Sequence, residues 1–220
     1  MKTSPSALPL DEPRRGGRPA AGTDPLKRRK IIDGADRIFS VTGFDAASMS
    51  DVSRAADVSK ATLYVYFENK EQLFATVCAE RRDRNIADLI ELLDRTRPIE
   101  TVLMEFGSQL SRCLSDPFVI SAHRVVIGVV ERMPEIGHEF FKAGPQRLAN
   151  ALAEFLSFHT KSGELIIDDP YFVAAQFLEL TQATIFRPRL YGVIKAAANE
   201  DEIKRVASSA VRILTTAYRT

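Results

Sequence analysis

The chain has 220 residues, of which 45% are hydrophobic and 27% are charged, and its formal net charge is +1. These proportions are typical of a globular protein with a hydrophobic core. No apolar run approaches the roughly 18 residues that cross a bilayer, and the N-terminal segment lacks the apolar stretch of a secretory signal. We therefore expect a cytoplasmic protein of one or two domains with no membrane partner.

Basic residues gather near the N-terminus although the whole chain is almost neutral. Between Arg14 and Lys30, seven lysines and arginines face a single acidic residue, Asp24. Residues 1–23 contain too few apolar side chains to form a core, so we predict a disordered basic arm. Its segment 15–19, Arg-Gly-Gly-Arg-Pro, resembles an AT-hook core, which makes Arg18 a candidate for an A·T-rich minor groove. A solvated tail is the alternative.

The first helix is predicted to begin after Asp24. Aspartate is a good N-cap, and Pro25 suits the first helical position. Apolar residues then recur at intervals of three and four until Gly43, which is typical of one buried helical face and a glycine stop.

Two short helices follow. Ser48 and Asp51 have the spacing of a capping box, and Ser59 caps a third helix over residues 60–67. Asp57 is placed in the turn between them because aspartate tolerates left-handed geometry. Steep crossing of these helices would pack together four apolar residues: Val52, Ala56, Val58 and Leu63.

The rest of the chain also indicates helices. Asn69 and Gln72 are spaced as a capping box for a long fourth helix that carries Leu93. Turn signals at residues 116–117, 133–134, 162–163 and 168–170 separate further helices, and Pro145 should kink or split one of them. A last helix is predicted over residues 201–218. Apart from a short run at 164–167, no segment has a strand pattern, so the predicted fold class is all-α.

The third helix would present a slim surface that carries hydroxyl groups and one cation. Such a surface fits a major groove about 12 Å wide, and the flanking helix N-termini attract phosphates. A helix-turn-helix that binds double-stranded DNA is therefore expected. Its candidate contact residues are Ser48, Ser59, Lys60, Thr62, Tyr64, Tyr66 and Lys70.

Residues 25–75 resemble the TetR/AcrR family of regulators. The resemblance rests on Ile31-Ile32, Gly43-Phe44 and above all on residues 63–73, Leu-Tyr-Val-Tyr-Phe-Glu-Asn-Lys-Glu-Gln-Leu. It implies that the third helix reads the major groove and that Tyr64, Tyr66 and Lys70 contact phosphates. The sequence departs from the family pattern at three positions, where it has Ser53 for alanine, Asp57 for glycine and Val65 for a basic residue.

Residues 129–145 and 163–170 resemble the AefR-like subgroup of that family. The resemblance implies a ligand cavity among the central helices, although each lining candidate can equally be a core residue. His123 is distinctive because it is a polar group among apolar neighbours. The candidates are Phe106, Leu110, His123, Ile127, Val130, Phe140, Phe141, Phe177 and Thr181.

The last two helices are the expected homodimer interface, since small residues there permit close packing around a two-fold axis. The candidates are Phe177, Leu178, Ile185, Val206, Ala210, Ile213, Leu214 and Ala217. No cofactor or metal is expected, because the three histidines do not pair at i, i+4 and the two cysteines lie far apart. Cys78 and Cys113 are predicted to be buried free thiols.

The sequence therefore predicts a helix-turn-helix domain over residues 24–70 and a helical ligand-binding and dimerisation domain over 71–220. The expected function is transcriptional regulation, with release from a palindromic operator by a small lipophilic effector. Repression is expected, and activation stays open. The alternatives are a helical carrier without specific DNA binding and a DNA-binding regulator that needs no ligand. No phosphate-binding loop, nucleophile elbow or metal motif suggests an enzyme.

Overall fold

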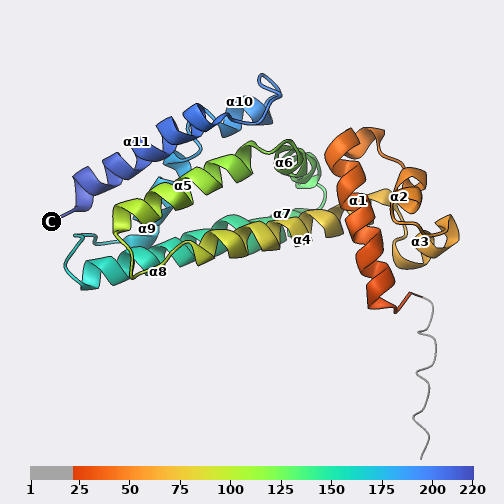
Figure 1. Ribbon diagram of the computed structural model, residues 1–220, viewed down its shortest axis with the longest axis horizontal. Helices are drawn as coiled ribbons and strands as arrows, with labels where there is room; N and C mark the ends of the chain where they lie inside the picture. Colours follow the sequence, from red (N-terminus) through yellow and green to blue (C-terminus); the bar gives the residue numbers. More distant parts are fainter. Residues whose placement is uncertain (1–21) are drawn as a thin grey trace, which may run out of the picture.

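The computed structural model describes residues 22–220, so Arg18 and the rest of the predicted basic arm lie outside the described residues. Helices α1 to α3 form a small head at one end, and the remaining helices form an elongated body (Figure 1). In the described part of the chain the only β-type pairing is an isolated bridge between Leu165 and Arg219, which confirms the all-α prediction. The helices are α1 Pro25–Ala46, α2 Met49–Ala55, α3 Lys60–Tyr66, α4 Lys70–Glu91, α5 Ile99–Ser115, α6 Pro117–Val129, α7 Pro134–Phe141, the π-helical turn η1 Lys142–Gln146, α8 Arg147–Lys161, α9 Pro170–Leu180, α10 Phe186–Leu190 and α11 Glu200–Tyr218.

Helix α1 begins and breaks where the sequence predicts. The Asp24 carboxylate accepts hydrogen bonds from the backbone N–H groups of Leu26 at 3.0 Å and Lys27 at 3.3 Å. At Gly43 the backbone turns to φ 76°, a region that favours glycine, and a short helical turn follows as far as Ala46.

The two short helices form as expected from their caps. Ser48 and Asp51 make a reciprocal capping box at the start of α2. Asp57 has φ 50°, which confirms its left-handed turn conformation. The Ser59 hydroxyl accepts a hydrogen bond from the Thr62 N–H at 3.0 Å at the start of α3. The head core includes the predicted Val52, Ala56 and Leu63 as buried residues, with Val58 packed against them.

A close contact between α1 and α2 depends on Gly34. A Cβ atom at this position would lie 2.8 Å from both the Cβ and the backbone nitrogen of Ala56. Because α2 lies so close to α1, the two helices pack almost backbone to backbone, and the head stays small.

Helix α4 begins one residue after the predicted cap, but the capping box is incomplete. The Asn69 side chain accepts a hydrogen bond from the Gln72 N–H at 2.8 Å. The Gln72 side chain accepts instead from the N–H of Glu68 at 2.7 Å, one residue before the cap. The helix ends at Glu91, so Leu93 lies just beyond it.

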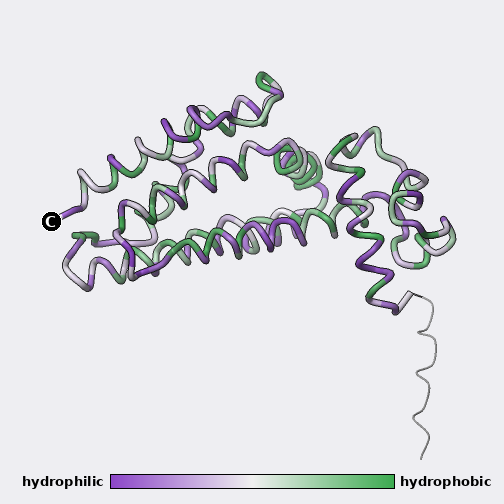
Figure 2. Tube along the Cα trace, in the orientation of Figure 1, coloured by the Kyte–Doolittle hydropathy of each residue, from purple (hydrophilic) through white to green (hydrophobic). Residues whose placement is uncertain are grey.

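The body is a bundle in which α11 lies along α5 and α9 lies against α8 (Figure 1). Apolar and polar residues alternate along α5 and α11, as expected of amphipathic helices with one buried face (Figure 2). Pro145 interrupts the regular α-helix between α7 and α8, as predicted, without ending the helical path. It lies in the π-helical turn η1, where the wider hydrogen-bonding pattern accommodates a residue without an N–H, and α7 continues through it into α8.

Candidate DNA-binding surface and effector cavity

The exposed face of α3 carries Lys60, Ala61, Tyr64 and Val65. Tyr64 is 51% exposed, and its side chain is free to reach beyond the head. Thr62 and Tyr66 are half-buried. The surface that α3 offers is therefore narrow, with a cation at its first residue and a phenol one turn later.

Several of the predicted hydroxyl contacts already have partners inside the head. The hydroxyls of Ser59 and Thr62 are 2.8 Å apart. The Tyr66 hydroxyl accepts a hydrogen bond from the Asp24 N–H at 3.2 Å, and the Ser48 hydroxyl lies 2.5 Å from Asp51 Oδ2. These groups thus stabilise the caps of α1, α2 and α3, and their contacts with DNA stay a prediction.

The ammonium group of Lys70 already has hydrogen-bond partners within the protein. Its ammonium group donates to the backbone carbonyls of Phe44 at 2.9 Å, Asp45 at 3.3 Å and Ala47 at 3.1 Å. It also lies 4.4 Å from the centroid of the Phe44 ring. An ammonium has three hydrogens to donate. Lys70 therefore joins the start of α4 to the last turn of α1 and to Ala47 just after it, and a phosphate would have to compete with these carbonyls.

The segment before α1 lies against α3. Gly22 has φ 86°, and a Cβ at this position would be 3.2 Å from Cγ1 of Val65. Two residues later, Asp24 donates its N–H to Tyr66. Val65, at the position where the family pattern favours a basic residue, thus contacts the start of the described chain.

Ion pairs join α1 of the head to α4 of the body. Arg28 and Arg29 lie 3.5 Å and 2.9 Å from the carboxylate of Glu80. Two turns further along α1, Asp36 pairs with Arg81 at 3.1 Å and with Arg84 at 3.6 Å. These ion pairs therefore connect the middle of α4 to α1.

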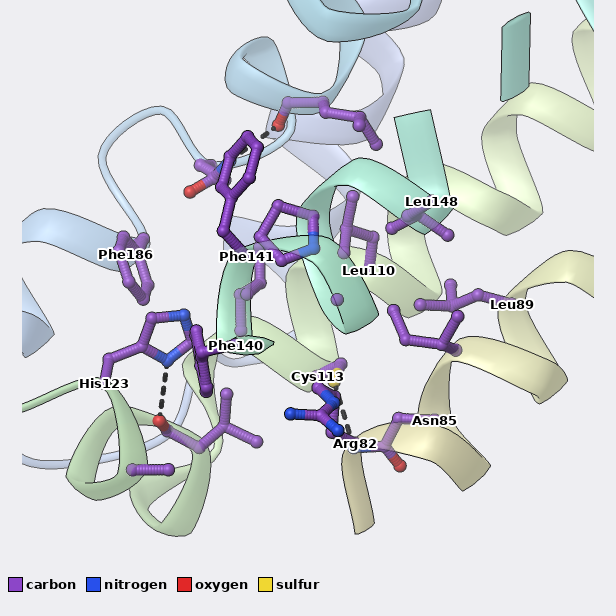
Figure 3. A pocket seen from close by; sticks show the side chains of 18 of the residues that line it. Arg82, Asn85, Leu89, Leu110, Cys113, His123, Phe140, Phe141, Leu148 and Phe186 are labelled. Carbon is purple, nitrogen blue, oxygen red and sulfur yellow. Dashed lines mark hydrogen bonds between the residues drawn. The ribbon is translucent and has the colours of Figure 1, made fainter. Parts of the chain in front are cut away.

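A cavity of about 400 Å³ lies in the body, a volume within the usual range of small-molecule sites. Its walls come from α4 to α10, and Figure 3 shows side chains from these helices converging on it. The apolar and aromatic lining is Ile86, Leu89, Leu110, Leu114, Phe118, Val119, Ala122, Phe140, Phe141, Gly144, Pro145, Leu148, Ala149, Tyr171, Ala175, Leu178 and Phe186. The polar and sulfur-containing lining is Cys78, Arg81, Arg82, Asn85, Cys113, His123, Glu179 and Gln182.

The cavity contains some of the predicted ligand contacts and not others. Leu110, His123, Phe140 and Phe141 line it. Five other candidates lie elsewhere because their side chains fill the core or face away: Phe106, Ile127, Val130, Phe177 and Thr181. Phe106 and Phe177 pack against each other with ring centroids 6.4 Å apart, and Ile127 is 58% exposed.

Sequence reasoning missed the contribution of α4 to the cavity. Cys78, Arg82, Asn85 and Leu89 all line it from this helix. Their spacing of three and four residues places them on one helical face, and that spacing was visible in the sequence. The polar residues within the stripe made it look like a solvent-facing side of the helix.

The two cysteines are free, as predicted, but they are partly rather than completely shielded from solvent. Both line the cavity. Burial from water raises the pKa of the Cys78 thiol to about 12 and that of the Cys113 thiol to about 11. Asn85 donates a hydrogen bond to the Cys113 sulfur at 3.3 Å. Both thiols therefore stay protonated at neutral pH.

The predicted dimer residues mostly point into their own protomer. Phe177, Leu178, Ile185, Val206, Ala210 and Leu214 are buried in the described chain, because these faces of α9 and α11 pack onto α5 and α8. Ile213 and Ala217 are exposed. They border a groove of about 690 Å³ on the outer side of α9 and α11, together with Phe172, Leu180 and Ala183. The buried candidates Phe177 and Leu214 line the same groove, so the predicted interface and this apolar groove overlap in part.

In residues 22–220, no group of His, Cys, Asp and Glu is arranged to hold a metal ion. Nor is any described helix long and apolar enough to cross a membrane.

The arrangement of α2 and α3 in the head is typical of helix-turn-helix transcriptional regulators. The sequence pattern of bacterial regulatory proteins of the tetR family matches residues 31–77, and that of the AefR-like transcriptional repressor C-terminal domain matches residues 101–220. The chain therefore belongs to the TetR family and carries an AefR-like C-terminal domain.

Individual relatives agree with this assignment. The HTH-type transcriptional regulator YhgD of Bacillus subtilis is 27% identical over 172 residues, which are 73% of this chain and 83% of YhgD. A solved TetR-family regulator from Mesorhizobium loti superposes with a TM-score of 0.75 at 25% identity, over 89% of this chain and 98% of that one. The flavonoid-responsive regulator FrrA superposes with a TM-score of 0.62 at 27% identity, over 88% and 97% of the two chains.

Proposed function

We propose that this regulator binds an operator through α3 and leaves it when a small molecule occupies the body cavity. One observation carries the proposal: α4 belongs to both sites. Its first residue, Lys70, binds the last turn of α1 and Ala47, and several of its residues from Cys78 to Leu89 line the cavity. A ligand that prefers one position of α4 would thereby change the position of the head, and useful release needs a preference of about 1–3 kcal/mol or more.

The DNA contacts proposed for the head are led by Lys60 and Tyr64, which are exposed and have no other role in the fold. Ser48, Ser59, Thr62 and Tyr66 would add contacts from the caps. Arg18 is proposed to insert into a minor groove that flanks the site of α3. The contact of Gly22 with Val65 supports this, because it places the start of α1 beside the helix that would lie in the major groove.

A homodimer is proposed through the groove between α9 and α11. Its apolar border, with Phe172 at 58% and Ile213 at 45% exposed, supports burial against a second copy. Two heads related by a two-fold axis would read a palindromic operator. Replacing Ile213 by glutamate should leave the fold intact and produce monomers in analytical ultracentrifugation. The control variant Lys161→Glu on α8 should leave both the fold and the dimer intact.

The effector is proposed to be small and largely apolar, in keeping with the lining of the cavity. One structural relative is described as flavonoid-responsive, which supports an aromatic compound. The AefR-like repressor domain supports repression as the outcome.

The decisive experiment is fluorescence anisotropy with the DNA upstream of the protein's own gene and a scrambled duplex. The variant Lys60→Ala/Tyr64→Ala removes exposed contacts without touching a cap, and Lys161→Ala is the matched control. Tight, sequence-dependent binding that only the double variant loses would support the proposal. The carrier alternative predicts weak, steeply salt-dependent binding of equal strength to both duplexes. It predicts the same weak binding to a duplex selected from random sequences.

A further inference from the structure

We propose that the cavity selects aromatic compounds that carry a ring hydroxyl, with His123 as the group that recognises the hydroxyl and Arg82 as the donor to a second oxygen. This inference rests on the proposed function, because it names the class of ligand for the same cavity. It follows from the hydrogen-bonding state of one histidine and from what surrounds it.

The protonation state of His123 is fixed by its neighbours. Its Nδ1 lies 2.8 Å from the backbone carbonyl oxygen of Val119, one turn earlier in α6. A carbonyl can only accept a hydrogen bond, so Nδ1 carries the hydrogen. Burial lowers the pKa of His123, and the ring is therefore neutral at pH 7. Nε2 is then a bare acceptor, on the edge of the ring opposite the Val119 bond (Figure 3).

Two aromatic rings hold His123 in place. Phe140 of α7 and Phe186 of α10 each meet it edge to face, with ring centroids 4.9 Å away in both cases. Phe141 and Tyr171 complete an aromatic side of the cavity. Such walls favour a flat aromatic ligand, and an acceptor nitrogen between them favours one whose ring carries a hydroxyl.

Arg82 supplies the complementary donor. It lies on α4, 6.0 Å from the centroid of Phe140, the ring that also contacts His123. A Cβ atom added at Gly144 would lie 3.3 Å from Cδ of Arg82. Its carboxylate partner in the described chain is the adjacent Asp83, at 3.3 Å and 55% exposed. Both bonds to Asp83 use Nε and Nη2, which leaves the donors on Nη1 for a ligand oxygen.

The other polar lining groups are less available. Arg81 is paired with Asp36 and lies 4.3 Å from the Phe118 centroid. Asn85 donates to Cys113, and Gln182 donates to the Leu178 carbonyl at 3.1 Å. Glu179 is 68% exposed, on the wall shared with the outer groove. Tyr171 also brings a phenol to the lining, but it is 43% exposed, so we assign the ligand contacts to His123 and Arg82.

Two compounds with the same skeleton test this directly. Naringenin carries three ring hydroxyls and a ring carbonyl, whereas flavanone has the carbonyl and no hydroxyl. In calorimetric titrations of the full-length wild-type protein, we expect naringenin to bind about tenfold more tightly, the usual value of one good hydrogen bond. This comparison needs no variant.

Two variants assign the effect to residues. His123→Phe keeps an aromatic ring between Phe140 and Phe186 and removes the acceptor. This variant should lower the affinity for naringenin about tenfold and leave the affinity for flavanone within about a factor of two of the wild-type value. Arg82→Met removes the donor to the carbonyl that both compounds share, so it should weaken both by a similar factor.

Equal binding of the two compounds to the wild type would overturn the proposal, as would a His123→Phe variant that keeps the preference for naringenin. Failure of both compounds to bind would also overturn it. Operator binding without ligand is measured separately, so a regulator that binds DNA but fails these titrations refutes the ligand class and leaves the DNA-binding function standing.

Discussion

The guanidinium of Arg81 in α4 lies 3.1 Å from the carboxylate of Asp36 in α1 and 4.3 Å from the centroid of the Phe118 ring. Arg81 also lines the cavity, so one side chain contacts the head, the body and the space for an effector. Asp36 receives Arg84 as well, at 3.6 Å. The head is thus attached to the body at the wall of the cavity.

Neutralising Asp36 should weaken this attachment. We expect Asp36→Asn to lower the free energy of unfolding by about 1–2 kcal/mol, because two arginines lose a partly buried partner. Asp33→Asn is the matched control, since Asp33 pairs only within α1, with Arg29 at 2.8 Å, and is 45% exposed. Urea unfolding measures both. Equal losses in the two variants would mean that the Asp36 pair contributes no more than a surface ion pair.

Gly34 should tolerate no side chain. A Cβ there would lie 2.8 Å from the backbone nitrogen of Ala56, which cannot move without displacing α2. We expect Gly34→Ala to destabilise the head by about 1–3 kcal/mol and to abolish operator binding. At Gly128 in α6 a Cβ would meet nothing within 4 Å, so Gly128→Ala should be neutral or stabilising by up to about 1 kcal/mol. Thermal unfolding and anisotropy distinguish the two cases.

Replacement of Lys70 should lower the stability of the protein, whereas replacement of Lys60 should not. Lys70→Met leaves three carbonyls without their ammonium donor, and we expect the free energy of unfolding to fall by about 2 kcal/mol. Lys60→Met should leave stability within about 0.5 kcal/mol, since Lys60 is exposed at the start of α3. If instead the Lys70→Met variant has the stability of the wild type and loses only its affinity for DNA, the role of Lys70 is to bind phosphate and not to stabilise the head.

His123 should make the protein sensitive to mild acid. Burial lowers its pKa in the folded state, so between that pKa and about 6.5 the unfolded chain binds a proton that the folded chain does not. Stability must then fall as the pH decreases through this window. Between pH 7 and 5.5, His123→Phe should lose less stability than the wild type in urea titrations. Parallel curves for the two proteins would contradict this prediction.

The head was predictable from the sequence because its signals are local. Asp24, Ser48 and Ser59 each cap a helix through contacts within three residues, and the turn at Asp57 depends on one backbone angle. Gly34 escaped notice because its reason for being glycine lies 22 positions away, in the backbone at Ala56.

The faces of α9 and α11 could not be assigned from the sequence. Both sides of these helices carry apolar residues, so periodicity alone does not say which side packs on the protomer and which meets a partner. Phe172 and Phe177 both line the groove, but Phe177 is buried against Phe106 while Phe172, five residues earlier, is exposed. The cavity raised the same difficulty, since its walls come from seven α-helices and the turn η1.

The two cavity thiols have a consequence for the signal that this protein can report. A thiol reacts with peroxides and quinones as its thiolate, and pKa values of about 12 for Cys78 and about 11 for Cys113 leave almost none of it at neutral pH. Burial therefore favours the protonated, less reactive form of both thiols. An effector that binds in the cavity, as proposed, would then be held without a covalent bond to either cysteine and could dissociate again.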